Sequence, residues 1–257
     1  MFVTYSPQNA KTKKLLENPD MQKWNWGEWR SLDILSGYSC PMAKLCHSKA
    51  AEYYNEKTGK FTRKIQDGKH TEFRCFSASQ ETRLAGVYNR RKQNFDLLKK
   101  YERDENAITD ILLNSWENRC SIMRPHVAGD YFSREYMLAW FNVAIEKPET
   151  LFYSYTKSLH WLIEEYDKKP DNFIFTASRG GFLDHYIGKY DLREAVVVYS
   201  EKQASELGLE IDHDDSHAAN PKIKDQSFAL LIHGTQPAGS EAAKALVQLN
   251  GKGSYRK

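Results

Sequence analysis

The chain of 257 residues is 40% hydrophobic and 13% aromatic, a composition typical of a globular protein with a sizeable core rather than of a disordered chain. Its 37 basic and 34 acidic residues leave a net charge of only +3, which is too small to indicate a nucleic-acid partner. No apolar run is long enough to span a membrane, and the first residues lack the apolar centre of a signal peptide. We therefore expect no membrane partner, a cytoplasmic location and reduced thiols.

The first part of the chain combines polar segments with one clear apolar run. Residues 1–22 are polar, and three tryptophans then lead into an apolar run that predicts a strand ending at Gly37. A long polar insert near residues 47–74 alternates weakly around Asp67 and Gly68. This pattern predicts a polar hairpin with its turn at that dipeptide.

Helical and strand patterns alternate through the rest of the chain. Apolar periodicity and capping residues predict helices over residues 78–101, 106–118, 134–148, 159–170, 184–191 and 240–250. Continuous apolar runs predict strands over residues 120–133, 151–158, 172–181, 194–202 and 227–234. This alternation indicates βαβ units and a parallel sheet, so we interpret residues 1–257 as a single α/β domain. A partial or irregular (β/α) barrel is our first expectation and an open doubly wound sheet the second, with a frayed tail at 248–257.

Functional residues of parallel α/β folds gather at the carboxyl ends of the strands. Polar side chains follow each predicted strand, at Cys40, His126, Asp130, Ser133, Tyr155, Thr156, Lys157, Ser178, Arg179, Ser200, Glu201, His233, Gly234 and Thr235. Loops are generally polar, so some of these positions only mark the end of a strand. The edge as a whole is therefore a stronger prediction than any one residue. The candidate pocket residues are His126, Asp130, Ser133, Thr156, Lys157, Ser178, Arg179, Glu201 and His233.

Three of the four cysteines have a spacing that suggests metal ligands. Cys40 and Cys46 lie in the segment SCPMAKLC, and Cys75 opens a helix-like run, giving the pattern C-x5-C-x28-C. Thiolates in this pattern suit a soft metal or an iron–sulfur cluster. Zinc is the alternative, but it usually takes four ligands, often from two close pairs. Three thiolates fit a [4Fe-4S] cluster with one open iron, unless Cys120 or His126 supplies a fourth ligand. The cysteines could also be small buried hydrophobes.

Cys120 and two polar clusters receive weaker interpretations. Cys120 lies at the amino end of its predicted strand, which is the opposite edge from the other thiols. The run DHDDSH, from Asp212 to His217, could bind a divalent metal, although such a run is more often a solvated acidic loop. Helical spacing favours a solvated basic face over a phosphate site for Arg90, Arg91, Lys92, Lys99 and Lys100.

Several motifs, in this order, resemble the phage gene product 88 family and its cyanophage-like members: SCPMAKLC, RCFSAS, HVAGDYFS, SYTKS and LLIHGTQPAGSEAAKAL. They extend from about Ser31 to Leu246. The family's CP pair and its C-(Y/F)-(A/S) helix start correspond to Cys40, Cys46 and Cys75. The family's H-x-S-G-D-F-x-S motif corresponds to His126, Gly129, Asp130, Phe132 and Ser133, with Ala128 in place of the usual serine.

In one respect this pattern is similar to radical S-adenosylmethionine proteins, which carry three cysteines at the mouth of an α/β barrel. Their usual C-x3-C-x2-C spacing lacks the long insert found here. The resemblance implies a phage-encoded protein, expected in the host cytoplasm, with a [4Fe-4S] cluster on Cys40, Cys46 and Cys75. S-adenosylmethionine would be a further cofactor if the chemistry is of the radical type. It leaves open whether the protein is an enzyme, and whether a small molecule or a phage or host protein is its partner. The alternatives are a non-enzymatic cluster or zinc protein and, less favoured, a metal-dependent nuclease that uses the DHDDSH run.

Overall fold

The chain builds a mixed α/β fold around an eight-stranded sheet in the computed structural model, which describes residues 1–249. The strands of the sheet are β1 (Ser6–Pro7), β2 (Glu28–Leu32), β5 (Cys120–Pro125), β6 (Leu151–Thr156), β7 (Phe173–Ser178), β8 (Glu194–Val198), β9 (Glu210–Ile211) and β10 (Phe228–Leu231). Only β1 runs antiparallel to its neighbour; the other pairings are parallel. The parallel sheet predicted from the alternation of strands and helices is therefore confirmed.

The strand order is β1-β2-β5-β6-β7-β8-β10-β9. From β2 to β8 neighbouring strands follow one another along the chain, as in a barrel wall, but β1 and β9 end the sheet and do not pair with each other. Among the described residues the sheet is thus open, and the expected barrel closure is not found. The doubly wound alternative is not matched either, because the order from β2 to β8 never reverses and creates no switch point.

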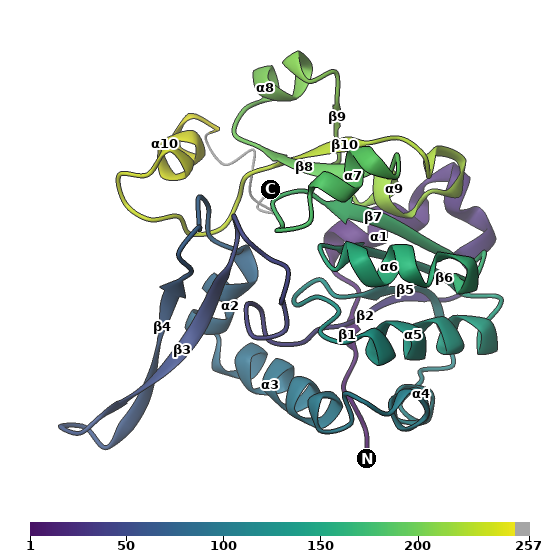
Figure 1. The fold of residues 1–257 in the computed structure, drawn as a ribbon, viewed down its shortest axis with the longest axis horizontal. Coiled ribbons are helices and arrows are strands. Elements are labelled where there is room, and N and C mark those ends of the chain that lie inside the picture. The colour runs from purple at the N-terminus through teal and green to yellow at the C-terminus, as the bar shows by residue number, and fades with distance from the viewer. Residues whose placement is uncertain (250–257) are drawn as a thin grey trace.

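Helices and 3-10 turns connect the strands and cover both faces of the sheet (Figure 1). They are α1 (Ala10–Glu17), η1 (Pro19–Trp24), α2 (Phe76–Arg83), α3 (Ala85–Lys100), α4 (Glu105–Asn114), α5 (Arg134–Glu146), α6 (Leu159–Glu164), η2 (Tyr166–Lys168), α7 (His185–Lys189), α8 (Glu201–Glu206), α9 (Ser216–Ala219), η3 (Pro221–Ile223) and α10 (Glu241–Gln248). No helix within residues 1–249 is long and apolar enough to cross a membrane. Residues 250–257, most of the tail expected to fray, lie outside the described part of the chain.

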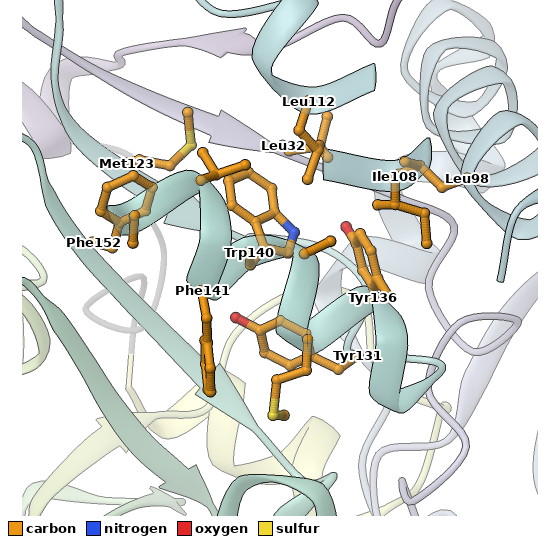
Figure 2. Packing of buried hydrophobic residues seen from close by; sticks show 14 of the residues in the cluster. Leu32, Leu98, Ile108, Leu112, Met123, Tyr131, Tyr136, Trp140, Phe141 and Phe152 are labelled. Atoms are coloured by element: carbon orange, nitrogen blue, oxygen red, sulfur yellow. The ribbon is translucent and has the colours of Figure 1, made fainter. Parts of the chain in front are cut away.

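Two hydrophobic cores, one on each face, explain why the strands read as continuous apolar runs. On one face Trp140 of α5 is fully buried in a cluster that includes Leu112 of α4 and Met123 of β5 (Figure 2). The other face packs against α1 and η1 through Leu15 and Met21, neither of which is exposed to solvent.

The N-terminal segment, residues 1–22, is polar in composition, but several of its residues are part of the folded core. Val3 and Tyr5 are buried in the main core, and the Tyr5 hydroxyl donates to the carbonyl of Leu112 at 2.9 Å. Strand β1 extends the sheet, and α1 and η1 cover one face of it. The apolar residues of this segment occur in small groups with polar residues between them, so they form no sustained periodic pattern.

The polar insert forms a two-stranded antiparallel ribbon of β3 (Ser48–Asn55) and β4 (Lys60–Asp67) that projects from the rest of the molecule (Figure 1). A hairpin was predicted here, but its turn lies between Asn55 and Gly59, not at Asp67 and Gly68. The carbonyl of Asn55 accepts the amides of Thr58 and Gly59, and Gly59 has a φ of 64°. That left-handed conformation favours glycine.

Helices α2 and α3 replace the single helix expected from Ala78 to Tyr101, because the backbone is extended at Leu84. The predicted solvated basic face of α3 is wrong at one position. Arg91 is only 3% exposed and pairs with the fully buried Glu81 of α2 at 3.1 Å. Lys92 pairs on the surface with Asp96, so that part of the face is solvated as expected.

Candidate functional site

A cavity of about 190 Å³ opens at the carboxyl edge of the parallel strands. Ten residues predicted from the sequence line it: Cys40, Cys46, Cys75, His126, Asp130, Tyr155, Thr156, Lys157, Ser178 and His233. They come from the loops after β2, β5, β6, β7 and β10 and from the start of α2. The strand-end pattern thus identified one continuous site.

Backbone hydrogen bonds hold the loop with Cys40 and Cys46 against the loop that follows β7. The amides of Lys44 and Leu45 both donate to the carbonyl of Gly180, at 3.1 and 2.9 Å. The amide of Phe182 in turn donates to the carbonyl of Met42 at 3.0 Å. The thiols therefore rest on a strand-end loop that the β6–β7–β8 sheet positions.

Cys75 reaches the same cavity from the other end of the ribbon, at the N-cap of α2. The amides of Glu72 and Phe73 donate to the carbonyl of Leu45, which ties this segment to the loop of the first two cysteines. Gln236 clamps it from the other side: its side chain accepts the Arg74 amide at 2.7 Å and donates to the Arg74 carbonyl at 3.1 Å. Nothing in the sequence pattern indicated this role for Gln236.

The loops that form the cavity approach each other closely near these thiols, and two glycines allow this approach. Gly129 has a φ of 96°, and a Cβ there would lie 2.4 Å from Ile34 and 2.7 Å from the Ser39 hydroxyl. Gly234 has a φ of 83°, and a Cβ there would lie 2.9 Å from the Cβ of Phe76. A side chain at either position would push apart two of the loops that form the cavity.

Burial is the main cause that raises the pKa of two of the thiols. The pKa of Cys40 lies well above its ordinary value, with further contributions from the charges of Asp130, Cys75 and Cys46. Burial raises the pKa of Cys75 to about 11, and the neighbouring Cys46 adds to the rise. Without a nearby positive charge these thiols stay protonated at neutral pH.

The described residues contain no group of three or more His, Cys, Asp or Glu side chains placed to hold one metal ion. A zinc ion draws its sulfur ligands to about 2.3 Å, so their sulfur atoms lie within roughly 4 Å of each other. The three thiols line one cavity, but no such ligand group forms there within residues 1–249.

Asp130 lines the cavity and also connects two of its loops through hydrogen bonds. Its Oδ1 accepts the Tyr131 amide and the Thr156 hydroxyl, and its Oδ2 accepts the Lys157 amide at 2.8 Å. Burial raises the pKa of this carboxyl against those hydrogen bonds. The ammonium of Lys157 donates to the Ser178 hydroxyl at 2.5 Å. Lys157 thus places a cationic donor at the cavity, next to a carboxylate whose oxygens already have partners.

His126 is held neutral and has one nitrogen without a partner. Its Nε2 lies 2.9 Å from the Tyr136 hydroxyl, while its buried Nδ1 makes no hydrogen bond. Burial lowers its pKa to about 3, with a smaller contribution from the charge of Arg124. Its backbone φ of 70° is the left-handed conformation, which turns the chain sharply after β5.

Sequence reasoning missed an ion pair at the cavity between Arg124, the fifth residue of β5, and Asp215. The Arg124 guanidinium donates to Asp215 Oδ2 at 2.6 Å, and the Tyr153 hydroxyl donates to the same oxygen at 2.8 Å. Asp215 belongs to the DHDDSH run, which the sequence pattern marks only as a candidate metal site or a solvated acidic loop. Arg124 raised no signal because it lies within an apolar strand.

Four predicted residues lie away from the cavity lining. Ser133 caps α5 by accepting the Tyr136 amide, Arg179 pairs with Glu194, and Glu201 begins α8. Cys120 is buried in the main core at the start of β5, the edge opposite the cavity, as its position in the sequence predicted. These placements give no support to Cys120 as a fourth ligand.

The DHDDSH run gives no support to a metal site. Asp212 accepts the Asp214 amide, and its Oδ1 lies 3.6 Å from His217 Nδ1. Asp215 is bound to Arg124, and Asp214 accepts the Ser216 amide, so each carboxylate of the run has at least one protein partner.

A profile of the gene product 88 family matches residues 3–249. No curated protein and no solved structure matches the chain. The motifs noted in the sequence lie within the matched range, and with nearly all of its residues aligned the chain belongs to the gene product 88 family.

Proposed function

We propose that this protein binds an iron–sulfur cluster through Cys40, Cys46 and Cys75 at the carboxyl edge of its sheet. The observation that carries the proposal is that these three thiols line one cavity, although the whole ribbon separates Cys75 from Cys40 and Cys46 in the sequence. Soft thiolate ligands are the usual donors for such clusters. Zinc remains the alternative metal, but it usually takes four ligands, and the fourth cysteine, Cys120, lies in the core outside the cavity.

The raised pKa values of the thiols are consistent with binding of a positively charged metal centre. Burial raises the pKa of Cys40 and Cys75, so their thiolates require a positive charge close to the sulfur atoms. Metal binding releases those protons, because the ligand is the thiolate. The unpartnered Nδ1 of His126 is a nitrogen donor in the same cavity, and it is a candidate for a fourth contact.

Radical S-adenosylmethionine-like chemistry is the catalytic form of this proposal. When bound, a cluster with one open iron would supply an electron and a binding position for the amino and carboxylate groups of that cofactor. The chain's own contribution would be Lys157, whose ammonium could hold an anionic group, positioned by the Ser178 hydroxyl and the Asp130 loop. The apolar walls, including Phe76 and Leu231, would limit access of water.

A non-enzymatic role is the second candidate, and one feature favours it. Cys46 lies two residues before β3, and Cys75 lies eight residues after β4, so the thiols bracket the ribbon. A cluster there would fasten both ends of the ribbon to the sheet edge. In that case the projecting ribbon, rather than the cavity, would meet the partner.

The test is the metal content of protein purified without oxygen. We expect about four iron atoms and matching sulfide per chain, a broad visible absorbance, and an electron paramagnetic signal after reduction. Cys40→Ala, Cys46→Ala and Cys75→Ala should each abolish the absorbance. Cys120→Ala is the matched control, because it removes a thiol outside the cavity. Protein that carries only zinc, or a Cys46→Ala variant that keeps its iron, would overturn the proposal.

A second measurement separates the two candidates. The reduced wild-type protein is incubated with S-adenosylmethionine, and release of methionine and 5′-deoxyadenosine is followed. Release that depends on the three cysteines and falls with Lys157→Met would support catalysis. An iron-loaded protein that releases neither product would favour the structural role.

A further inference from the structure

The β3–β4 ribbon has two chemically different faces, because side chains alternate along each strand. One face turns toward the body of the protein at its base, and nearer the turn it exposes Tyr54 and Phe61. On it, Arg63 donates to the carbonyl of Glu81 at 3.0 Å and lies 4.8 Å above the ring of Tyr88. Ala50 is fully buried on the same face against Leu35 and Tyr88.

The opposite face carries Lys49, Tyr53, Lys60 and Lys64, which we call the lysine–tyrosine face. These residues occupy the alternate positions of the two strands, with Asn55 opposite Lys60 and Tyr53 opposite Thr62. None of the strand positions on this face is a carboxylate. Tyr53 is 45% exposed, and the Lys64 ammonium lies 5.7 Å from its ring.

A second lysine and tyrosine repeat this arrangement near the base of the ribbon. The Lys49 ammonium lies 4.9 Å from the ring of Tyr38, which is 42% exposed. The Tyr38 hydroxyl donates to the carbonyl of Ala50, which places the ring beside β3. Exposed rings next to ammonium groups thus recur along the ribbon.

We propose that the lysine–tyrosine face binds single-stranded nucleic acid. Proteins that bind single strands combine cations along the phosphate backbone with aromatic rings on which bases stack, and this face offers both. The eight-residue strands span about 26 Å at 3.3 Å per residue, enough for a few nucleotides. The small net charge of the whole chain does not oppose this, because the cations concentrate on one carboxylate-free face of a projecting element.

An acidic protein surface would also attract these lysines, but it would leave the exposed rings unexplained. Stacking needs flat, accessible rings held apart from one another, and Tyr38 and Tyr53 are anchored at separate places along the ribbon. This inference is independent of the iron–sulfur proposal, since none of the four side chains lines the cavity.

The experiment uses the full chain and a fluorescently labelled poly-dT oligonucleotide of about 20 nucleotides, a length above the site size of one binding module. The variant Lys49→Gln/Lys60→Gln/Lys64→Gln removes three charges from the face. The matched control, Lys13→Gln/Lys14→Gln/Lys202→Gln, removes three exposed charges elsewhere. Thermal unfolding of both variants confirms that each is folded.

We expect the wild type and the control to bind alike and the ribbon variant to bind much more weakly. The slope of log affinity against log salt should fall by about 2 in the ribbon variant, since each phosphate contact on a single strand contributes about 0.7. Tyr53→Ala should weaken binding about tenfold, the size of one lost stacking interaction, with no change in that slope.

Three results would overturn the inference. The first is equal loss of binding in the ribbon and control variants, which would indicate attraction to total charge. The second is binding of poly-glutamate as tight as that of poly-dT, which would point to an acidic protein. The third is a preference for duplex DNA over the single strand together with an unchanged affinity of Tyr53→Ala.

Discussion

At the scale of single residues, the buried pair of Arg91 and Glu81 decides how two helices meet. Glu81 is fully buried, and it accepts the Ser36 amide and hydroxyl as well as the Arg91 guanidinium. Burial raises the pKa of Glu81, while Arg91 and Ser36 lower it, and burial is the larger cause. Arg91 also donates to Gln80 at 3.1 Å. This network joins α2 and α3 to the loop that leads to Cys40.

Such a pair could not be read from the sequence. A run of basic residues at helical spacing predicts a solvated face, and only the break at Leu84 turns α3 so that Arg91 meets α2. The residue at the break, Leu84, is neither proline nor glycine, so the sequence does not mark a helix end at that position. A helical pattern gives the face of a residue, but not the element that packs against it.

Arg91→Met should lower the free energy of unfolding by about 3–5 kcal/mol, because it leaves Glu81 buried without its cation. Lys92→Met on the same helix is the control. It removes an exposed pair with Asp96, so the change should stay within about 0.5 kcal/mol. Urea unfolding at neutral pH measures both, and equal stability of the two variants would show that the buried pair does not stabilise the contact between the helices.

At the scale of elements, β5, β6, β7, β8 and β10 and the helices α5, α6, α7 and α10 were predicted from the sequence, together with the edge on which the cavity lies, whereas α8, β9 and α9 were not. The apolar runs of the predicted elements are long and end at polar residues, so local pattern and fold agree. The ribbon was only partly predicted, since its first strand is polar and its turn lies at a glycine that the alternation did not mark. Contacts made across the fold, such as Arg124 with Asp215, leave no local pattern.

Gln236 shows how one side chain can set the place of a whole segment. Gln236→Ala removes the acceptor of the Arg74 amide and the donor to the carbonyls of Arg74 and His233. Since these groups lie in a half-buried segment, the loss should cost about 1–3 kcal/mol. Hydrogen exchange of the Arg74 amide should quicken strongly.

The control for Gln236 is Gln203→Ala, which removes a comparable amide-to-backbone bond, to Tyr199 on an exposed helix start. It should leave exchange at Arg74 unchanged. If Gln236→Ala also leaves that exchange unchanged, the clamp is not what holds the Cys75 segment. If iron binding weakens in Gln236→Ala while the protein stays folded, then ligation of iron by Cys75 depends on how Gln236 positions the Cys75 segment.

At the scale of the whole molecule, the sheet is open, and loops cover the edge at which its parallel strands end. The barrel expectation came from consecutive strands, and that order does hold from β2 to β8. Closure would require β9 or β10 to reach β1, but the N-terminal strand is short and antiparallel. The connection between β2 and β5 holds the ribbon, α2, α3 and α4, and its segments around Cys46 and Cys75 line one side of the cavity. The connection between β2 and β5 therefore positions the three cysteines, although the barrel interpretation treated part of that connection as an insert.

The stability of the folded chain should depend on pH through His217. Its Nε2 lies 3.0 Å from Glu210 of β9, and its Nδ1 lies 3.6 Å from Asp212, so it joins the edge strand to α9. These carboxylates, with Asp212 the larger cause, raise its pKa to about 9. Because this is above the unfolded value of about 6.5, the stabilisation is fully present below pH 6.5. It is lost as pH rises through 9.

His217→Gln should therefore be less stable than the wild type by about 1–3 kcal/mol at pH 6, after allowance for solvent screening. The difference should shrink between pH 6.5 and 9 and level off above that, because the wild-type imidazole is then neutral. His213→Gln, at an exposed histidine in the same loop, is the control and should show no such trend. Urea unfolding from pH 6 to 10 measures the three proteins. A constant difference between His217→Gln and the wild type would mean that packing, and not charge, is what His217 contributes to holding the edge of the sheet.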